Sequence, residues 1–252
     1  MDNDINGNKN AAIQDFDTAI SLNHNNVNAY YGRARVKSHL KDYKGAIADI
    51  NRGLGVLPKD NYMRNGDFKS FRADCEKIIN KNSDAAKDYK AAIQDYNKTL
   101  QLYTCSGFAL ERRSYVEDRL KDYKAAITDM TTAIRCNPQE VFYYYNLADL
   151  KNKSGDYEGA ILVSKSALKL KPNSDLAFFT LGYSYYQLKD YKSAIDDFNK
   201  CLFTEPTFYK ALYYRGLAKF NLNEKNAACD DWHKATANGY KKADSLIKVN
   251  CE

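Results

Sequence analysis

A six-residue stretch of polar, aromatic, small and aliphatic positions recurs along the chain. It reads Asp-Tyr-Lys-Ala-Ala-Ile at residues 122–127, and near copies begin at residues 42, 88, 156 and 190. The tyrosines of successive copies are separated by 46, 34, 34 and 34 residues. A fixed period of this size is typical of stacked repeat proteins, in which each unit buries its apolar face only on its neighbours. The pattern therefore predicts a repeat array in which one interval carries twelve additional residues.

Within each period, the sizes of the side chains suit two packed helices. We number each unit from 1 to 34 so that the alanine of the recurring stretch is position 20. Small residues at positions 8 and 20 let two helices approach closely, and large residues at position 24 fill the remaining space. The small residues are Ala34, Ser114, Ala148, Gly182 and Gly216 at position 8, and Ala12, Ala46, Ala92, Ala126, Ala160, Ala194 and Ala228 at position 20; the large ones are Phe16, Ile50, Tyr96, Met130, Phe198 and Trp232, with Ser164 as the exception.

Proline and aspartate mark where the predicted helices stop and start. Every proline of the chain falls at position 32, where it ends the second helix of a unit because it cannot continue a helix. An aspartate at position 16 precedes each second helix and can accept hydrogen bonds from its free amide groups. Each unit is thus predicted to consist of a helix, a turn and a second helix that ends near the proline. These residues are Pro58, Pro138, Pro172 and Pro206, and Asp42, Asp88, Asp122, Asp156 and Asp190.

The chain resembles the tetratricopeptide repeat family in this pattern. The resemblance includes small residues at position 27, which are Ala19, Gly53, Ala133, Ala167 and Ala235. It implies an all-α fold, a right-handed superhelical solenoid of antiparallel helix pairs. It also implies a concave face built mainly from the first helix of each pair. We expect a single solenoid over residues 1–252, with a half repeat at 1–26, repeats at 27–60, 61–106, 107–140, 141–174, 175–208 and 209–242, and a capping helix at 243–252.

Two of these units depart from the regular pattern. The half repeat contains only a second helix, about Asn8 to Leu22, so we expect a fragment or an atypical first helix. The 61–106 unit holds the twelve additional residues. For that unit the spacing predicts a turn at 65–66, a helix from about Asp67 to Asn80 and a longer turn after it. Insertions in repeats of this kind are expected to be loops.

The end of the chain resembles the closing segment of many bacterial members of this family, in which a final helix covers the last repeat. In that arrangement Cys251 lies near Cys229, and the sequence leaves open whether they form a disulfide or remain two buried thiols. Cys201, at position 27, is expected to be a small core residue.

Composition narrows the class of protein further. The net charge is +6, from 38 basic and 32 acidic side chains spread through all units, without a block of like charges. No stretch approaches the roughly 18 apolar residues of a membrane span, so we expect a soluble chain with no membrane partner. No signal peptide is visible, but the start within a repeat leaves cytoplasmic and periplasmic locations open.

The sequence offers no catalytic, metal or cofactor site. Phosphate-binding glycine loops, nucleophile turns, zinc-ligand spacings and paired catalytic carboxylates are absent from it. The adjacent pairs Asp196-Asp197 and Asp230-Asp231 point about 100° apart on a helix, and we interpret them as solvated surface. His233 is expected to be structural as well. We therefore predict a protein that is not an enzyme.

A surplus of 21 tyrosines supplies the functional hypothesis. The resemblance implies that positions 2, 5, 6, 9, 12 and 13 of each first helix face the concave groove. Tyrosine is enriched at recognition surfaces because it presents a large apolar face and a hydroxyl at small entropic cost. We predict a peptide-binding or protein-binding scaffold whose groove is lined by Tyr31, Arg35, Phe108, Arg112, Tyr115, Arg119, Phe142, Tyr145, Asn146, Asp149, Lys153, Phe179, Tyr183, Tyr186, Lys210, Tyr213, Tyr214 and Phe220, with Glu111 and Asp118 among them.

One partner can be disfavoured and two alternatives stay open. Family members that bind the acidic tails of heat-shock chaperones carry a lysine and asparagine clamp. In this chain Asn146 is the only residue that matches the clamp, because the repeat before it has Glu111 and Tyr115 at the clamp positions. An aromatic and basic groove can also stack single-stranded nucleic acid. Alternatively, the face of Ile13, Phe16 and Ile20 on the first helix would let the chain associate with itself.

Overall fold

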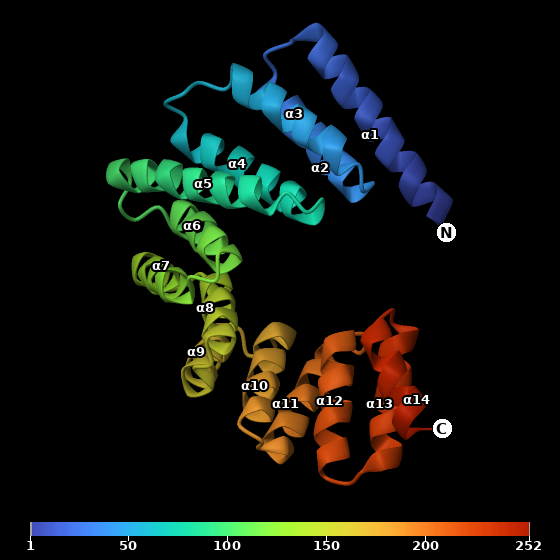
Figure 1. Ribbon diagram of the computed structural model, residues 1–252. Helices are drawn as coiled ribbons and strands as arrows, with labels where there is room; N and C mark the ends of the chain where they lie inside the picture. The colour runs from blue at the N-terminus through green and yellow to red at the C-terminus, as the bar shows by residue number, and fades with distance from the viewer. Residues whose placement is uncertain (1, 252) are drawn as a thin grey trace. The chain divides into compact units, whose positions relative to one another are not determined.

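The computed structural model describes the backbone of residues 2–251 and the side chains of residues 8–251. Over that range every regular element is a helix, which confirms the predicted all-α fold of helix pairs (Figure 1). The chain divides into two compact units, Met1–Asp122 and Tyr123–Glu252. No helix in the described range is long and apolar enough to cross a lipid bilayer.

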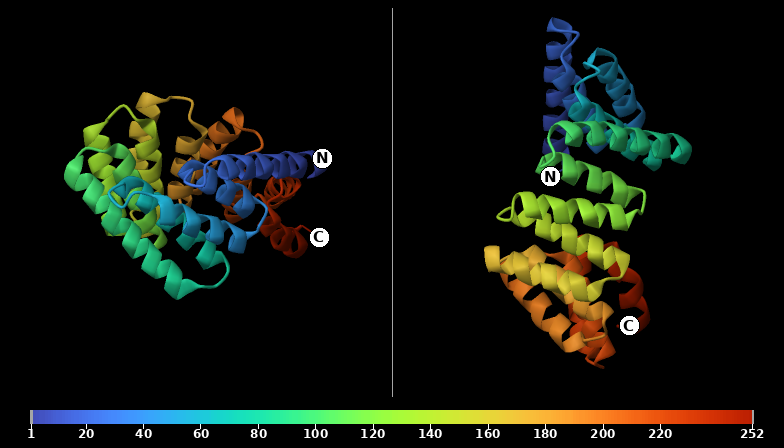
Figure 2. Two further views of the ribbon diagram at one scale, coloured as in Figure 1. Left: turned by 90° about the horizontal axis from the view of Figure 1, so that it is seen from above. Right: turned by 90° about the vertical axis from the view of Figure 1, so that its left-hand side faces the viewer.

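The first unit is a stack of antiparallel helices in chain order. α1 packs on α2, which pairs with α3, and α4 pairs with α5 before α6 ends the unit (Figure 2). Polar caps start several of these helices; the Asp42 carboxylate, for example, accepts a hydrogen bond of 2.9 Å from the Gly45 amide at the start of α3. The bounds are α1 Asp2–Leu22, α2 Val27–His39, α3 Tyr43–Val56, α4 Tyr62–Ile78, α5 Asn82–Leu102 and α6 Gly107–Arg119.

The second unit continues with α7 and then three complete helix pairs. The pairs are α8 with α9, α10 with α11, and α12 with α13, and the last pair is covered by η1 and α14. Ala194 and Ala228, at position 20, are fully buried in this stack. The bounds are α7 Tyr123–Cys136, α8 Val141–Ser154, α9 Tyr157–Leu170, α10 Asp175–Gln187, α11 Tyr191–Thr204, α12 Tyr209–Asn221, α13 Lys225–Ala237, η1 Lys241–Ala243 and α14 Asp244–Asn250.

The residues at positions 8 and 24 pack on each other as predicted. A Cβ atom built on Gly182 would lie 2.7 Å from Cδ1 of Phe198, and one on Gly216 would lie 2.5 Å from Nε1 of Trp232. Both rings are fully buried. The glycines thus set the distance between the two helices of each pair, since any larger residue would meet the ring.

The additional residues of the 61–106 unit lengthen its two helices, so the expectations of a loop and of a turn at Asn65-Gly66 were wrong. α4 has 17 residues and α5 has 21, whereas α2 has 13 and α3 has 14. Asn65 and Gly66 lie buried inside α4. The turn between the helices is short and passes through Asn80, whose φ is +63°. The unit remains a helix pair in which both helices are longer.

This lengthening also shifts the register that the sequence pattern suggested. α5 begins at Asn82, with Lys81 as its N-cap, so Asp88 lies inside the helix and does not cap it. Counted from the left-handed turn residue, Asp88 occupies the place that Asp49 holds in the preceding unit, eight residues after Asn80 and Lys41 respectively. The copy of the recurring stretch in this unit therefore lies about two helical turns further along its helix than the others do.

A buried or half-buried arginine joins three helices in several repeats, and the sequence analysis missed it. The arginine stands eight residues before the turn residue that has a left-handed backbone conformation. Its guanidinium binds an aspartate eight residues after that turn residue and a side chain of the preceding second helix. We call this arrangement the arginine bridge. Its sets are Arg33 with Asp49 and Asp17, Arg72 with Asp88 and Asn51, and Arg215 with Asp231 and Asn199.

The burial of these carboxylates overturns one prediction. Asp231 is 1% exposed and Asp197 is 6% exposed, so neither belongs to a solvated surface. Only Asp196 and Asp230, their neighbours, face solvent. The prediction failed because it considered adjacent residues on one helix, whereas the partner of Asp231 lies 16 residues away on the other helix of the pair.

The closing segment covers the last pair as expected from the resemblance. η1 and α14 pack against α13, and Ala243 is fully buried there. A disulfide joins Cys229 of α13 to Cys251, with the two Cα atoms 5.7 Å apart. Cys201 is a buried free thiol whose pKa is raised to about 12 by burial. His233 is exposed on α13.

Candidate binding cavity

A cavity of about 310 Å³ opens in the second unit beside its first helices. α8, α10 and α12 supply most of its wall, and the turn after α13 supplies the rest. We call it the aromatic cavity. It is lined by Asp149, Asn152, Lys153, Phe179, Thr180, Tyr183, Lys210, Tyr214, Tyr240 and Lys242.

Six of the predicted groove residues meet at this cavity, which are Asp149, Lys153, Phe179, Tyr183, Lys210 and Tyr214. They come together because corresponding positions of successive first helices lie side by side in a stack of repeats. The sequence analysis missed Tyr240 and Lys242, since both lie in the irregular segment after α13 where the repeat numbering ends. Asn152 and Thr180 were also outside the predicted set.

Ring contacts hold the aromatic wall in place. The rings of Tyr183 and Tyr214 meet edge to face with centroids 5.0 Å apart, and Phe179 stacks on Phe208 at the same distance. Tyr240 stacks on Tyr209, with 5.1 Å between centroids. Contacts of this kind prefer offset or edge-on geometry and stiffen the side chains that make them. The wall is therefore largely preformed.

The hydroxyl groups of this wall stay protonated at neutral pH. Burial is the main cause that raises the pKa values of Tyr183, Tyr214 and Tyr240 above that of an ordinary tyrosine. A protonated hydroxyl can donate one hydrogen bond and accept others. The cavity thus combines apolar ring faces with hydroxyl donors.

The charges around the cavity are unequal. Lys153 pairs with Asp149, with 2.8 Å between Nζ and Oδ2. Among residues 8–251 no carboxylate lies within ion-pair distance of Lys210 or Lys242. Asn152 lies deeper, where its amide oxygen accepts a hydrogen bond of 2.8 Å from Ser184. The cavity therefore presents two cationic groups that have no acidic partner.

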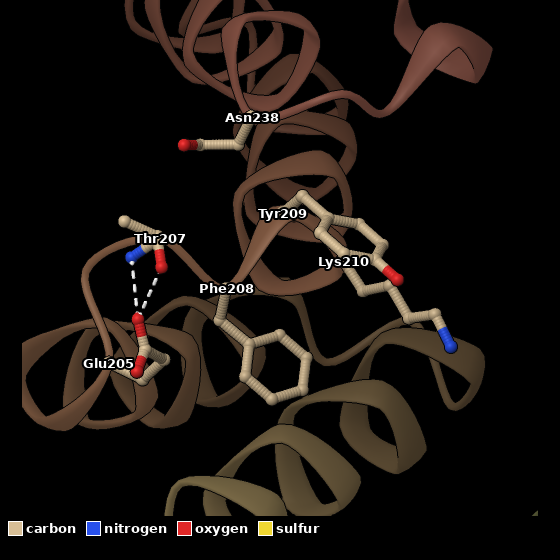
Figure 3. A pocket seen from close by; sticks show the side chains of 6 residues that line it. All are labelled: Glu205, Thr207, Phe208, Tyr209, Lys210 and Asn238. Atoms are coloured by element: carbon tan, nitrogen blue, oxygen red, sulfur yellow. Dashed lines mark hydrogen bonds between the residues drawn. The ribbon is translucent and has the colours of Figure 1, made fainter. Parts of the chain in front are cut away.

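A second hollow of about 450 Å³ adjoins the N-terminus of α12 and shares Lys210 with the aromatic cavity. Figure 3 shows Glu205 and Thr207 joined by hydrogen bonds on one side of it, with Tyr209 and Lys210 on the other. The hydrogen bonds from Thr207 lower the pKa of Glu205. Since that carboxylate is already bonded within its own loop, this hollow offers fewer free polar groups than the aromatic cavity.

The remaining predicted residues of the second unit lie outside the cavity lining. Tyr186 packs on Tyr191 and Tyr214, Tyr213 on Tyr240, and Phe220 on Trp232. Phe142 is exposed, Asn146 is half-buried, and the buried hydroxyl of Tyr145 has no hydrogen-bond partner among the described residues. Several predicted groove rings thus pack helix against helix.

In the first unit the predicted residues engage acidic side chains of α4. The Tyr115 hydroxyl and Arg119 Nε donate to the Asp74 carboxylate at 2.7 and 3.1 Å, and Arg112 lies 3.8 Å from Asp67. Burial raises the pKa values of Asp67 and Glu111. Tyr31 packs on Phe68 and Phe71, whereas Arg35 and Phe108 are exposed. Asp67 and Asp74 were missed because the register of their unit is shifted.

The apolar face of α1 is partly occupied within the chain. Ile13, Phe16 and Ile20 are each half-buried, and the Phe16 ring lies against Gly32 of α2. Self-association through this face would therefore bury less apolar area than the sequence suggested.

Comparison with known proteins identifies the repeats. Residues 148–189 match a family described as "TPR repeat", and residues 176–208 match the tetratricopeptide repeat family. No curated protein sequence matches the chain. A tetratricopeptide repeat protein from Parabacteroides merdae ATCC 43184 has a similar structure, with 20% identity over 100% of this chain and 95% of that one and a TM-score of 0.72.

Two further structures share the fold. The crystal structure of MamA is 22% identical over 65% of this chain and 96% of that one, with a TM-score of 0.56. The APC/C hetero-tetramer Cut9-Hcn1 is 16% identical over 98% of this chain and 47% of that one, with a TM-score of 0.66. The fold defines an α-solenoid built from helix pairs. Residues 148–208 match the tetratricopeptide repeat family, and the chain has the fold of such repeat proteins.

Proposed function

We propose that the protein is a non-enzymatic scaffold that binds a segment of a partner protein in the aromatic cavity. The observation that carries this proposal is the meeting of aromatic side chains from α10, α12 and the segment after α13 with Lys210 and Lys242, which have no ion-pair partner within residues 8–251, at one preformed hollow. Tetratricopeptide repeat proteins are typically interaction scaffolds, and function in such folds resides in a site of this kind.

The chemistry of the wall indicates the chemistry of the segment. The rings of Phe179, Tyr183 and Tyr214 favour an extended or helical peptide with apolar or aromatic side chains. Lys210 and Lys242 favour at least one carboxylate on it, since a charged donor forms a stronger hydrogen bond with an ionised acceptor. The segment we propose therefore carries both an apolar residue and an acidic group.

A display library of random peptides provides the test. Enriched peptides would be synthesised, and their affinities measured for the wild type and for the Tyr183→Ala/Lys210→Ala variant, each checked for folding by circular dichroism. Loss of a central ring and a facing charge is expected to weaken binding by at least about tenfold. Phe142→Ala is the matched control, because Phe142 is 45% exposed and lies outside the cavity.

Two results would overturn the proposal. One is a set of peptides that bind the double variant as tightly as the wild type. The other is a protein that enriches no peptide but binds oligothymidylate with a steep salt dependence, as single-stranded nucleic-acid binding would produce.

A further inference from the structure

A third pocket, separate from the aromatic cavity and from the hollow at α12, lies where the arginine bridge is missing. In the repeat that turns at Gly155, Leu147 stands eight residues before the turn residue and Val163 eight residues after it. Leu147 thus replaces the arginine and Val163 replaces the aspartate. Thr131 of α7 occupies the place that Asn199 holds beside Arg215. All three residues line one pocket of about 210 Å³.

The pocket is apolar because its polar side chains are already bonded to the backbone. The Thr131 hydroxyl donates to the carbonyl of Ile127, and Ser166 donates to that of Leu162. The hydroxyl of Tyr144 donates to the Pro138 carbonyl. The rest of the lining is Ile134, Leu147, Leu162 and Val163. A ligand that enters the pocket therefore finds mainly carbon surface, and the protons of these three hydroxyls are already donated to the backbone.

Leu162 marks the mouth of the pocket on the outer surface of α9. Its side chain is 68% exposed, and the corresponding residues of other units are Ala48, Asp196 and Asp230. A single exposed leucine is ordinary on a protein surface, but here it extends the apolar lining of the pocket to the surface. An apolar cavity of about 150 Å³ admits benzene, so this pocket has room for a phenylalanine ring.

The charged side chains beside this pocket are mainly basic. Lys169 follows Ser166 by three residues on α9, and Arg135 follows Thr131 by four residues on α7. Both are exposed, and neither takes part in an ion pair within residues 8–251. One exposed carboxylate, Glu158, precedes Leu162 by four residues on α9. The rim thus carries an excess of positive charge and favours a negatively charged partner.

We propose that the pocket between α7, α8 and α9 is a docking site for an acidic segment of a partner protein, which inserts one large apolar side chain beside Leu162. Carboxylates flanking that side chain pair with Arg135 and Lys169. This site does not depend on the aromatic cavity.

The test uses the full chain and a defined probe, the capped peptide Glu-Asp-Phe-Asp-Glu. Methyl NMR would follow the signals of Leu147, Leu162 and Val163 as the peptide is added. The same peptide with alanine in place of phenylalanine, and one with lysine in place of every acidic residue, are expected to bind at least about tenfold more weakly.

Two variants close or charge the pocket. Leu147→Arg with Val163→Asp rebuilds the arginine bridge of the other repeats and fills the space. Leu162→Glu changes an exposed side chain and keeps the test valid if the double variant fails to fold. Both are expected to lose binding by about tenfold or more, whereas Phe203→Ala, on an exposed residue of α11, leaves it unchanged.

Three results would overturn the proposal. The phenylalanine and alanine peptides bind with equal affinity, or Leu162→Glu retains full binding, or no methyl signal moves at about 5 mM peptide. Loss of binding in Tyr183→Ala but not in Leu162→Glu would place the peptide in the aromatic cavity and would also reject this site.

Discussion

Arg215 and Asp231 form a bidentate pair across the last helix pair, with Nε to Oδ2 at 2.8 Å and the second nitrogen to Oδ1 at 2.5 Å. Lys219 reaches the same carboxylate at 2.8 Å, and Arg215 also bonds Asn199 of the preceding pair. The carboxylate is almost fully buried. A single side chain thus ties α11, α12 and α13 together.

Replacing Asp231 with alanine is expected to destabilise the second unit by about 3 kcal/mol. The change leaves Arg215 and Lys219 without their anion in a partly buried place, and an uncompensated charge there is costly. Urea unfolding followed by circular dichroism would measure the loss.

Asp230→Ala is the matched control for this prediction, because Asp230 is exposed on the same helix turn. It is expected to change the free energy of unfolding by no more than about 0.5 kcal/mol. Equal effects of the two substitutions would show that the buried carboxylate of Asp231 contributes no more to the free energy of unfolding than the exposed carboxylate of Asp230 does.

Two glycines are expected to respond to alanine with opposite signs. Gly216→Ala places a methyl group against Trp232 and the carbonyl of Ala228, so it should lower the unfolding midpoint. Gly55→Ala meets nothing within 4 Å and should raise the free energy of unfolding by about 0.5 kcal/mol, because alanine restricts the unfolded chain. Thermal unfolding would measure the change in midpoint for both variants. A change of the same sign in both would contradict the packing described for α12.

The sequence was sufficient for the fold because its period, its small residues and its prolines all report the local helix pair. It was insufficient wherever two residues far apart in the chain decide the outcome. An arginine and an aspartate recur at the spacing of Arg215 and Asp231, but their pairing is visible only when the two helices of a unit are compared. In the 61–106 unit the copy at Asp88 indicated a register that the longer α4 and α5 do not follow. Tyr240 lies in the irregular segment after α13 and not on a first helix, so no pattern placed it beside Tyr213.

The disulfide between Cys229 and Cys251 is expected to govern the local stability of the closing helix. Replacing both cysteines with serine removes the link that holds the end of α14 to α13. Amide hydrogen exchange should then accelerate in α14, while amides of α8 keep their protection. Unchanged exchange in α14 would show that the packing of Ala243 alone holds this helix.

Asp197 is expected to behave in the opposite way to Asp231. Leu181 occupies the place of the arginine, so within residues 8–251 the buried carboxylate has only the exposed Lys200, at 2.7 Å, as an ion-pair partner. Burial raises its pKa, although Lys200 acts in the other direction. The folded state therefore holds this proton more tightly than the unfolded state does, and the stability that it contributes is lost as pH rises through the titration of the carboxyl.

Asp197→Asn should consequently match or exceed the stability of the wild type at pH 7, because it removes a buried charge that is poorly paired. As the pH falls through the titration of the carboxyl, wild-type Asp197 takes up its proton and the difference between the two proteins should shrink. Asp231→Asn serves as the comparison and should lower the midpoint of urea unfolding at pH 7. A similar loss in Asp197→Asn would show that Lys200 compensates this carboxylate as fully as Arg215 compensates Asp231.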